Sequence, residues 1–158
     1  MVILGIDPGI AITGYGVVKT TPKLCWVAHG TIDTPKNKLA QERLLLLEQG
    51  LKKLFKKYKP GILCVEKLYF FKNIKTALPV SEARGIVLLI AARNHLPVQE
   101  FTPQQVKIAA TGYGKAQKKQ VQRMVQQILC LKTLPRPDDA ADALGVALAS
   151  SVLTRRSK

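Results

Sequence analysis

The chain has 158 residues, 47% of them hydrophobic, with 25 lysines and arginines against 10 aspartates and glutamates. This length suits one domain with a real core, and the formal charge of +15 favours a polyanionic partner, most often nucleic acid. No apolar run approaches the roughly 20 residues of a membrane span, and the first residues do not resemble a secretion signal. Composition therefore argues against a membrane-spanning or secreted protein and predicts a cytoplasmic one.

The first 66 residues predict three strands, a helix and a fourth strand. Apolar residues at 2–6 and 13–18 predict strands joined by a tight Asp-Pro-Gly turn, and residues 24–32 predict a third strand. Leucines at helical spacing with lysines between them predict an amphipathic helix over 44–58. Residues 62–65 read as a short strand buried on both faces.

The second half alternates helices with one more strand. The expected elements are a helix at about 76–94 in spite of Pro79, a strand at 97–101, a helix from 103, an amphipathic helix over 121–129 and a last helix over 138–153. Thr102 followed by Pro103 has the residue types of a helix N-cap and first position. This order predicts an α/β domain with a mixed sheet.

The three cysteines, Cys25, Cys64 and Cys130, are odd in number and lack the C-x-x-C spacing of metal or redox motifs. Each has apolar neighbours in the sequence. We therefore expect buried free thiols in a reducing compartment rather than metal ligands.

Four of the ten acids have positions that suggest a shared site. Asp7 and Glu66 each follow an apolar strand directly, and open α/β sheets commonly place their sites at that edge. Asp139 and Asp142 are three residues apart on a helix, so they share one face. Converging carboxylates repel one another unless cations neutralise them, and Mg²⁺ prefers such oxygen ligands. The pattern predicts a metal site with Asp7 at its centre.

A structural interpretation stays open for each of these acids separately. Asp7 can serve as a turn former before Pro-Gly, and Glu66 as an ordinary strand-end residue. Asp138 and Asp139 can cap a helix, and Asp142 can lie on a surface. The hypothesis of a joint site depends on all of them meeting in space.

In order and spacing, several segments resemble the RuvC family of Holliday-junction resolvases, within the RNase H-like superfamily. The similarity covers nearly the whole chain, and the segments are GIDPG with TGYGVV, VEKLYFFKN, EARG, QVKIAATGYGKAQKKQVQRMV and DAADALGVALA. The sequence departs from the family pattern at Ser81-Glu82 and at Phe71.

The resemblance implies an RNase H-like fold, a five-stranded mixed sheet flanked by helices, over residues 1–154 with a short basic tail at 155–158. It implies a homodimer that nicks four-way DNA junctions symmetrically in recombination and repair, beside a junction-binding and branch-migration helicase complex. The implied catalytic and metal-binding acids are Asp7, Glu66, Asp139 and Asp142. They would hold a pair of Mg²⁺ ions, with Mn²⁺ able to substitute. Asp138 is then a helix-terminal acid favoured by the dipole.

Basic and aromatic residues are the candidates for DNA binding. Lys107 and Lys118 match basic positions that the family uses near the cut phosphate. The segment TGYGKAQKK, which includes Lys118, adds two glycines and the further lysines Lys115 and Lys119, which suit contacts with phosphate, although a plain loop before a solvated helix face would also explain them. Tyr69 and Phe70 follow Glu66; by similarity this loop would stack on unpaired bases, although at least one of these aromatics could belong to the core.

Three other functions fit parts of the pattern. Asp-x-Gly after a first strand also opens the phosphate loop of actin-like ATPases, but no second phosphate motif follows. A non-catalytic basic binder would not need acids at all four positions. A relative that acts on RNA·DNA hybrids would share the same acids, and only comparison of substrates separates it.

Overall fold

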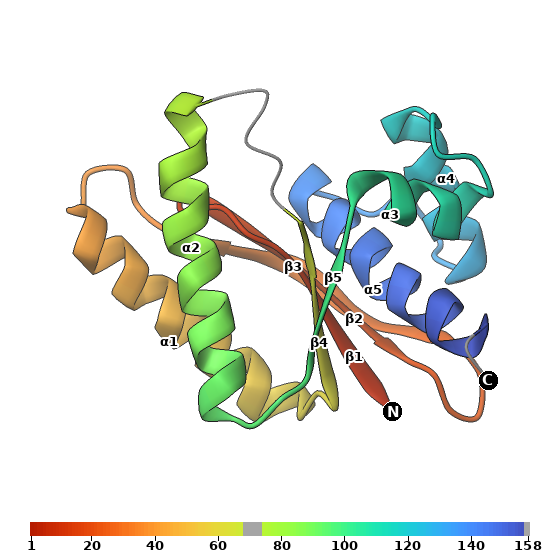
Figure 1. Ribbon diagram of the computed structural model, residues 1–158, viewed down its shortest axis with the longest axis horizontal. Coiled ribbons are helices and arrows are strands. Elements are labelled where there is room, and N and C mark those ends of the chain that lie inside the picture. Colours follow the sequence, from red (N-terminus) through yellow and green to blue (C-terminus); the bar gives the residue numbers. More distant parts are fainter. Residues whose placement is uncertain (68–73, 157–158) are drawn as a thin grey trace.

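The computed structural model describes residues 1–67 and 74–156, and its centre is a sheet of five strands (Figure 1). The strands are β1 (Val2–Asp7), β2 (Ile12–Lys19), β3 (Cys25–Asp33), β4 (Ile62–Glu66) and β5 (Val98–Phe101). Their order across the sheet is β3-β2-β1-β4-β5. β1 and β3 run antiparallel to β2, whereas β4 runs parallel to both β1 and β5. The predicted mixed sheet is confirmed.

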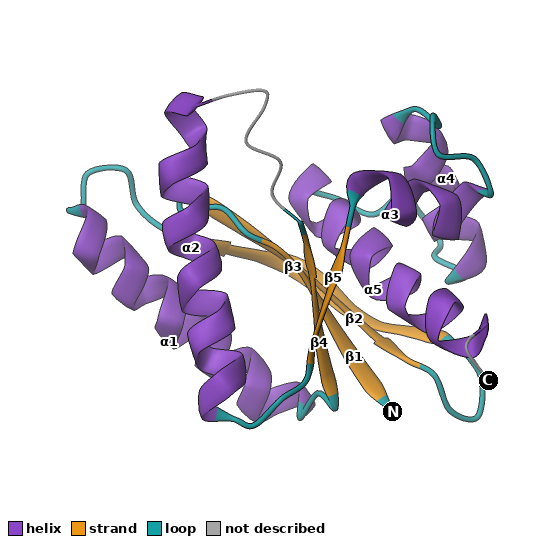
Figure 2. Ribbon diagram, viewed as in Figure 1, coloured by secondary structure: helices purple, strands orange, loops and turns teal. Residues whose placement is uncertain are grey.

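Helices cover both faces of this sheet. In the described residues they are α1 (Ala40–Tyr58), α2 (Ile74–Arg93), α3 (Pro103–Thr111), α4 (Lys118–Ile128) and α5 (Asp138–Arg156). α1 and α2 lie on one face, and α3, α4 and α5 lie on the other (Figure 2). None of the helices in the described ranges has both the length and the apolar character to span a bilayer.

The alternation of side chains along β1 divides the core into two layers. Leu4 and Ile6 are fully buried against α1 and α2, whereas Ile3 faces α5 and packs with Leu144 and Leu148. This follows from the two-residue period of a strand, which sends neighbouring side chains to opposite faces. Every second residue of β1 therefore faces α5, and Asp7 continues that series.

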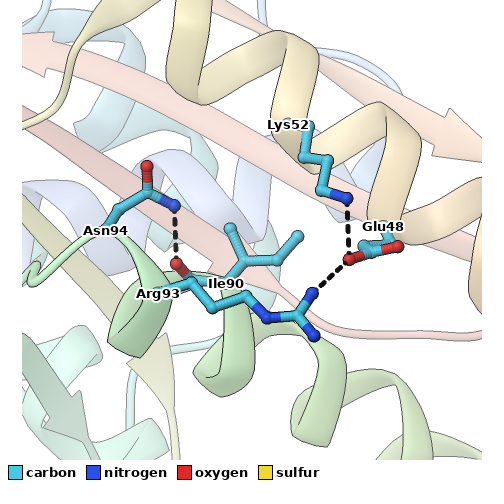
Figure 3. A network of polar contacts seen from close by, with 5 residues as sticks. All are labelled: Glu48, Lys52, Ile90, Arg93 and Asn94. Atoms are coloured by element: carbon cyan, nitrogen blue, oxygen red, sulfur yellow. Dashed lines mark hydrogen bonds and ion pairs between the residues drawn. The ribbon is translucent and has the colours of Figure 1, made fainter.

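A polar cluster joins the outer sides of α1 and α2 (Figure 3). Glu48 Oε1 lies 2.9 Å from Lys52 Nζ and 2.7 Å from Arg93 Nη1, so one carboxylate holds a cation from each helix. Asn94 donates to the carbonyl of Ile90 at 2.8 Å, which satisfies a carbonyl in the last turn of α2. The Arg93–Glu48 ion pair therefore links two helices whose buried sides cover the sheet face away from α5.

Some element boundaries differ from those expected. α1 begins at Ala40 instead of 44, because the Leu39 N–H donates to Glu42 Oε2 at 2.9 Å and so satisfies an exposed donor of the first turn. α4 begins at Lys118 instead of 121, after the Gln117 N–H donates to Gln120 Oε1 at 2.7 Å. The N-cap at Thr102 is confirmed, since its hydroxyl accepts from the Gln105 N–H at 3.1 Å.

The prediction of three buried thiols is wrong for Cys130. Cys64 is buried and Cys25 half-buried, but Cys130 is exposed. It follows α4 with a positive φ of 52°, and this left-handed turn sends the preceding Leu129 into the core in its place. Apolar neighbours in the sequence do not reveal that change of direction.

Candidate active site

Two acids end neighbouring parallel strands on one face of the sheet. β1 and β4 pair in a register that sets Ile6 opposite Val65, and the next step of that register brings Asp7 opposite Glu66. Because side chains alternate along each strand, both carboxylates lie on the face that α5 covers. The expectation that Asp7 and Glu66 meet at one sheet edge is therefore met.

Helix α5 rests on the sheet at glycines, and this contact brings the other two acids to the same edge. A Cβ at Gly14 would lie 2.0 Å from the carbonyl oxygen of Asp139, and one at Gly16 would lie 2.6 Å from a backbone nitrogen of α5. Both strand positions must be glycine for the helix backbone to approach so closely. Gly14 pairs with Asp7 in the sheet, so the first turn of α5 brings Asp139 to the end of β1. Asp142 follows on the same helix face.

The acids act on one another electrostatically. The pKa of Asp7 is raised from 3.8 to about 7, mainly by burial. The neighbouring carboxylates contribute to this rise, in decreasing order Asp142, Glu66 and Asp139, and the charge of Lys118 partly opposes it. Burial also raises the pKa of Glu66, with the charge of Asp142 adding to the rise, and burial raises the pKa of Asp142 itself. Four carboxylates from three separate segments therefore form one cluster.

A lysine from α4 supplies the counter-charge of this cluster. Lys118 Nζ donates to Asp142 Oδ2 at 2.8 Å and lies 3.3 Å from Asp138 Oδ2. Burial alone would lower the pKa of Lys118, but its contacts with Asp142 and Asp138 outweigh that effect and raise it. The ammonium therefore stays charged at neutral pH. Asp138 begins α5 as predicted, and its partnership with Lys118 could not be read from sequence spacing.

A small hollow opens between the two lysines that match the family pattern. It has a volume of about 180 Å³, and its wall includes Glu66, Lys107, Lys118 and Asp142. Lys107 is half-buried, and its charge lowers the pKa of Glu66 against the stronger effect of burial. The hollow is therefore lined by two carboxylates and two ammonium groups.

The donor set fits a hard divalent cation. Among residues 1–67 and 74–156, no three His, Cys, Asp or Glu side chains already stand in an arrangement that would hold a metal. Burial, with smaller contributions from the neighbouring carboxylates, favours protonation of Asp7. Carboxylate oxygens alone, partly buried at a sheet edge, are the ligands that Mg²⁺ takes together with substrate phosphate.

The turn after Asp7 is braced by residues that the sequence analysis did not single out. The Thr13 hydroxyl donates to the carbonyl of Gly9, and the Thr34 hydroxyl donates to the carbonyl of Ile10. Arg43 Nε in turn donates to Thr34 Oγ1 at 2.9 Å. Thr13 is fully buried. A hydroxyl residue within an apolar strand was the feature of the sequence that could have indicated this role. The contacts of Thr34 and Arg43 with this turn join segments that are distant in the sequence, so no local sequence pattern predicts them.

The other predicted DNA-binding residues are placed differently. Lys119 is exposed on α4 and lines a second, larger cavity beside the hollow. Lys115 is exposed in the loop between α3 and α4, outside the wall of either cavity. Tyr69 and Phe70 lie outside the described residues, as do Phe71 and residues 157–158 of the basic tail.

The sheet order, the helices on both faces and the acidic edge define a nuclease-type domain of the RNase H-like class. A family model described as "Crossover junction endodeoxyribonuclease RuvC" matches residues 3–150. A relative of that name from Thermosipho melanesiensis is 49% identical over 156 residues, which cover 98% of this chain and 99% of the relative. The chain therefore belongs to the RuvC family.

Solved structures agree with this assignment. The structure of Thermus thermophilus RuvC in complex with a Holliday junction substrate superposes with a TM-score of 0.92 at 36% identity, covering 99% of this chain and 96% of that one. A yeast mitochondrial Holliday junction resolvase superposes with a TM-score of 0.63 at 15% identity, covering 98% and 83%, and so shares the fold. The RNase H-like fold predicted from the sequence is confirmed.

Proposed function

We propose that this protein is a Holliday-junction-resolving endonuclease that hydrolyses phosphodiester bonds by symmetric nicking of four-way DNA junctions in recombination and repair. The observation that carries the proposal is the convergence of Asp7, Glu66, Asp139 and Asp142, in which Asp7 has a pKa of about 7. Membership of the RuvC family supports the same reaction. The relative solved with a Holliday junction supports the substrate.

The four acids would hold a pair of Mg²⁺ ions, with Mn²⁺ able to substitute. When bound, such ions about 4 Å apart activate water and stabilise the leaving oxygen of an in-line displacement. Asp7 must lose its proton before it can serve as a ligand, so the site charges fully only when cations arrive. Lys118 and Lys107 would then place positive charge beside the phosphate that is cut.

DNA outside the cut would be held by further residues and by a second subunit. Lys115 and Lys119 are exposed and suit phosphate contacts, and Tyr69 and Phe70 remain candidates for stacking on bases. Symmetric nicking of two strands implies a homodimer of domains spanning 1–154, with the tail at 155–158 as a loose phosphate contact. A junction-binding and branch-migration helicase complex is the proposed partner, and the cytoplasm is the proposed location.

A strand-labelled junction assay tests the proposal. Wild-type protein should nick four-way junctions at symmetric positions in Mg²⁺ and leave them intact with a chelator, and Asp7→Asn should bind the junction without cutting it. Linear duplexes and RNA·DNA hybrids of the same sequence serve as controls. Preferred cutting of hybrids would replace the proposed substrate, and binding without cutting by the wild type would indicate a non-catalytic binder.

A further inference from the structure

A large cavity beside the acidic site has four basic side chains in its wall, together with leucine, proline and glutamine. It has a volume of about 800 Å³ and lies between α4 and the segment 134–138 that leads into α5. The basic residues in its wall are Lys118, Lys119, Arg123 and Arg136. In the part of the wall that the structure describes, Asp138 is the one acid. The wall therefore carries an excess of positive charge.

Three of these cations keep their charge available for a ligand. Lys119, Arg123 and Arg136 are exposed, and within residues 1–67 and 74–156 none of them forms an ion pair. Lys118 by contrast is bonded to carboxylates of α5. Arg136 is near enough to Asp138 for its charge to act on that carboxylate. A hollow with these exposed cations and a single acid, Asp138, in its described wall is suited to an anion.

The cavity adjoins the acidic site. Lys118 lines both this cavity and the smaller hollow with Glu66 and Asp142, and Asp138 in the cavity wall directly precedes Asp139. A DNA strand carries one negative charge per nucleotide, so a strand whose phosphate sits at the acids brings further phosphates close to α4. Buried Pro135 fixes the wall opposite the helix.

We propose that this cavity is a phosphate subsite for the DNA strand next to the cut, in which Lys119, Arg123 and Arg136 bind one or two flanking phosphates. The two arginines can contact phosphate oxygens through two N–H groups each, whereas Lys119 acts as a point charge. The subsite rests on the proposed nuclease function, because that function brings the strand to the acids. It goes further by assigning the neighbouring phosphates to side chains outside the acidic cluster.

The test is junction binding by an Arg123→Gln/Arg136→Gln double variant, measured with a chelator present so that the DNA stays intact. For the wild type and the variant, log affinity is plotted against log salt concentration. Each lost phosphate contact should make the slope less steep by about 1, so a change of about 1–2 is expected. Lys53→Gln/Lys56→Gln is the matched control, since both lysines are exposed on α1 across the sheet, and it should keep the wild-type slope.

A second experiment locates the contacted phosphate along the DNA strand. It uses junctions in which one backbone phosphate is replaced by an uncharged methylphosphonate. Scanning this substitution through the positions flanking the cut should weaken wild-type binding about tenfold at one or two of them. The same substitutions should not weaken binding by the double variant further. Arg123→Lys/Arg136→Lys keeps the charge and should keep most of the slope, which separates loss of charge from loss of folding.

A wild-type slope in the double variant, or equal losses at every methylphosphonate position, would overturn the subsite. Failure of the wild type to cut junctions in Mg²⁺ would instead contradict the proposed function. The binding comparison remains readable in that case, because it needs no cleavage.

Discussion

Lys118 Nζ lies 2.8 Å from Asp142 Oδ2 and 3.3 Å from Asp138 Oδ2, so one ammonium bridges two carboxylates at the start of α5. This cation occupies the neighbourhood that a divalent ion would share. It pairs with the acidic cluster, and it would compete with a bound metal ion for Asp142. A substitution of Lys118 should therefore change metal affinity and cleavage rate in opposite directions.

Lys118→Gln should bind Mn²⁺ more tightly than the wild type when no DNA is present, by roughly threefold to tenfold, because a competing positive charge is gone. Cleavage of junctions should nevertheless slow by about tenfold or more, since the same charge assists at the phosphate. Calorimetric titration and the cleavage assay measure the two effects. Lys119→Gln, one residue along α4 and facing the larger cavity, is the control and should leave Mn²⁺ affinity unchanged. Weaker Mn²⁺ binding by Lys118→Gln would contradict this account of the lysine.

Asp7→Asn should stabilise the metal-free protein at alkaline pH. The folded pKa of Asp7 is about 7 and its ordinary value 3.8, so the wild type loses stability as pH rises from about 4 and levels off above about 7. Asparagine stays neutral and avoids this loss. At pH 8 the variant should gain about 3 kcal/mol relative to the wild type, on the order of 5–10 °C in Tm.

Thermal unfolding between pH 5 and 8.5 measures this difference. Asp33→Asn, which removes an exposed carboxylate at the end of β3, controls for the loss of one charge. Added Mg²⁺ should raise the Tm of the wild type at pH 8 more than that of Asp7→Asn. A Tm difference between Asp7→Asn and wild type that does not change with pH would refute the raised pKa.

Gly14→Ala should displace the first turn of α5, because the new Cβ would lie 2.0 Å from the Asp139 carbonyl oxygen. We expect a stability loss of about 1–3 kcal/mol and a fall in cleavage of more than tenfold, measured well below the Tm. Gly85→Ala is the matched control: it is exposed within α2, and nothing lies within 4 Å of its Cβ. It should be neutral or stabilise by about 0.5–1 kcal/mol. Equal activity of the two variants would show that close packing at Gly14 does not position Asp139.

The acidic cluster could be predicted from the sequence because its geometry follows from local rules. Asp7 and Glu66 each continue an apolar strand, and the two-residue period places both on one face. Asp139 and Asp142 are set by helical spacing. The adjacency of β1 and β4 and the packing of α5 on the sheet had to be assumed; the observed register supplies the first, and the close contacts at Gly14 and Gly16 supply the second.

The parts of the site that the sequence did not reveal depend on long-range packing. Lys118 meets Asp138 only because α4 packs beside α5, and the larger cavity depends on the path of the segment 134–138. The contact of Arg43 with Thr34 likewise joins α1 to the end of β3. No periodicity reports such contacts between distant segments.

The central claim is that four carboxylates gather to hold divalent ions where a DNA strand is cut. Crystals soaked in Mn²⁺, at a concentration that supports cleavage, test it most directly through anomalous scattering. The account predicts two peaks about 4 Å apart, with Asp7 contacting both and with Glu66, Asp139 and Asp142 around them. Asp7→Asn crystals should lose at least one peak. Peaks elsewhere on the surface, with none beside Asp7, would contradict the account.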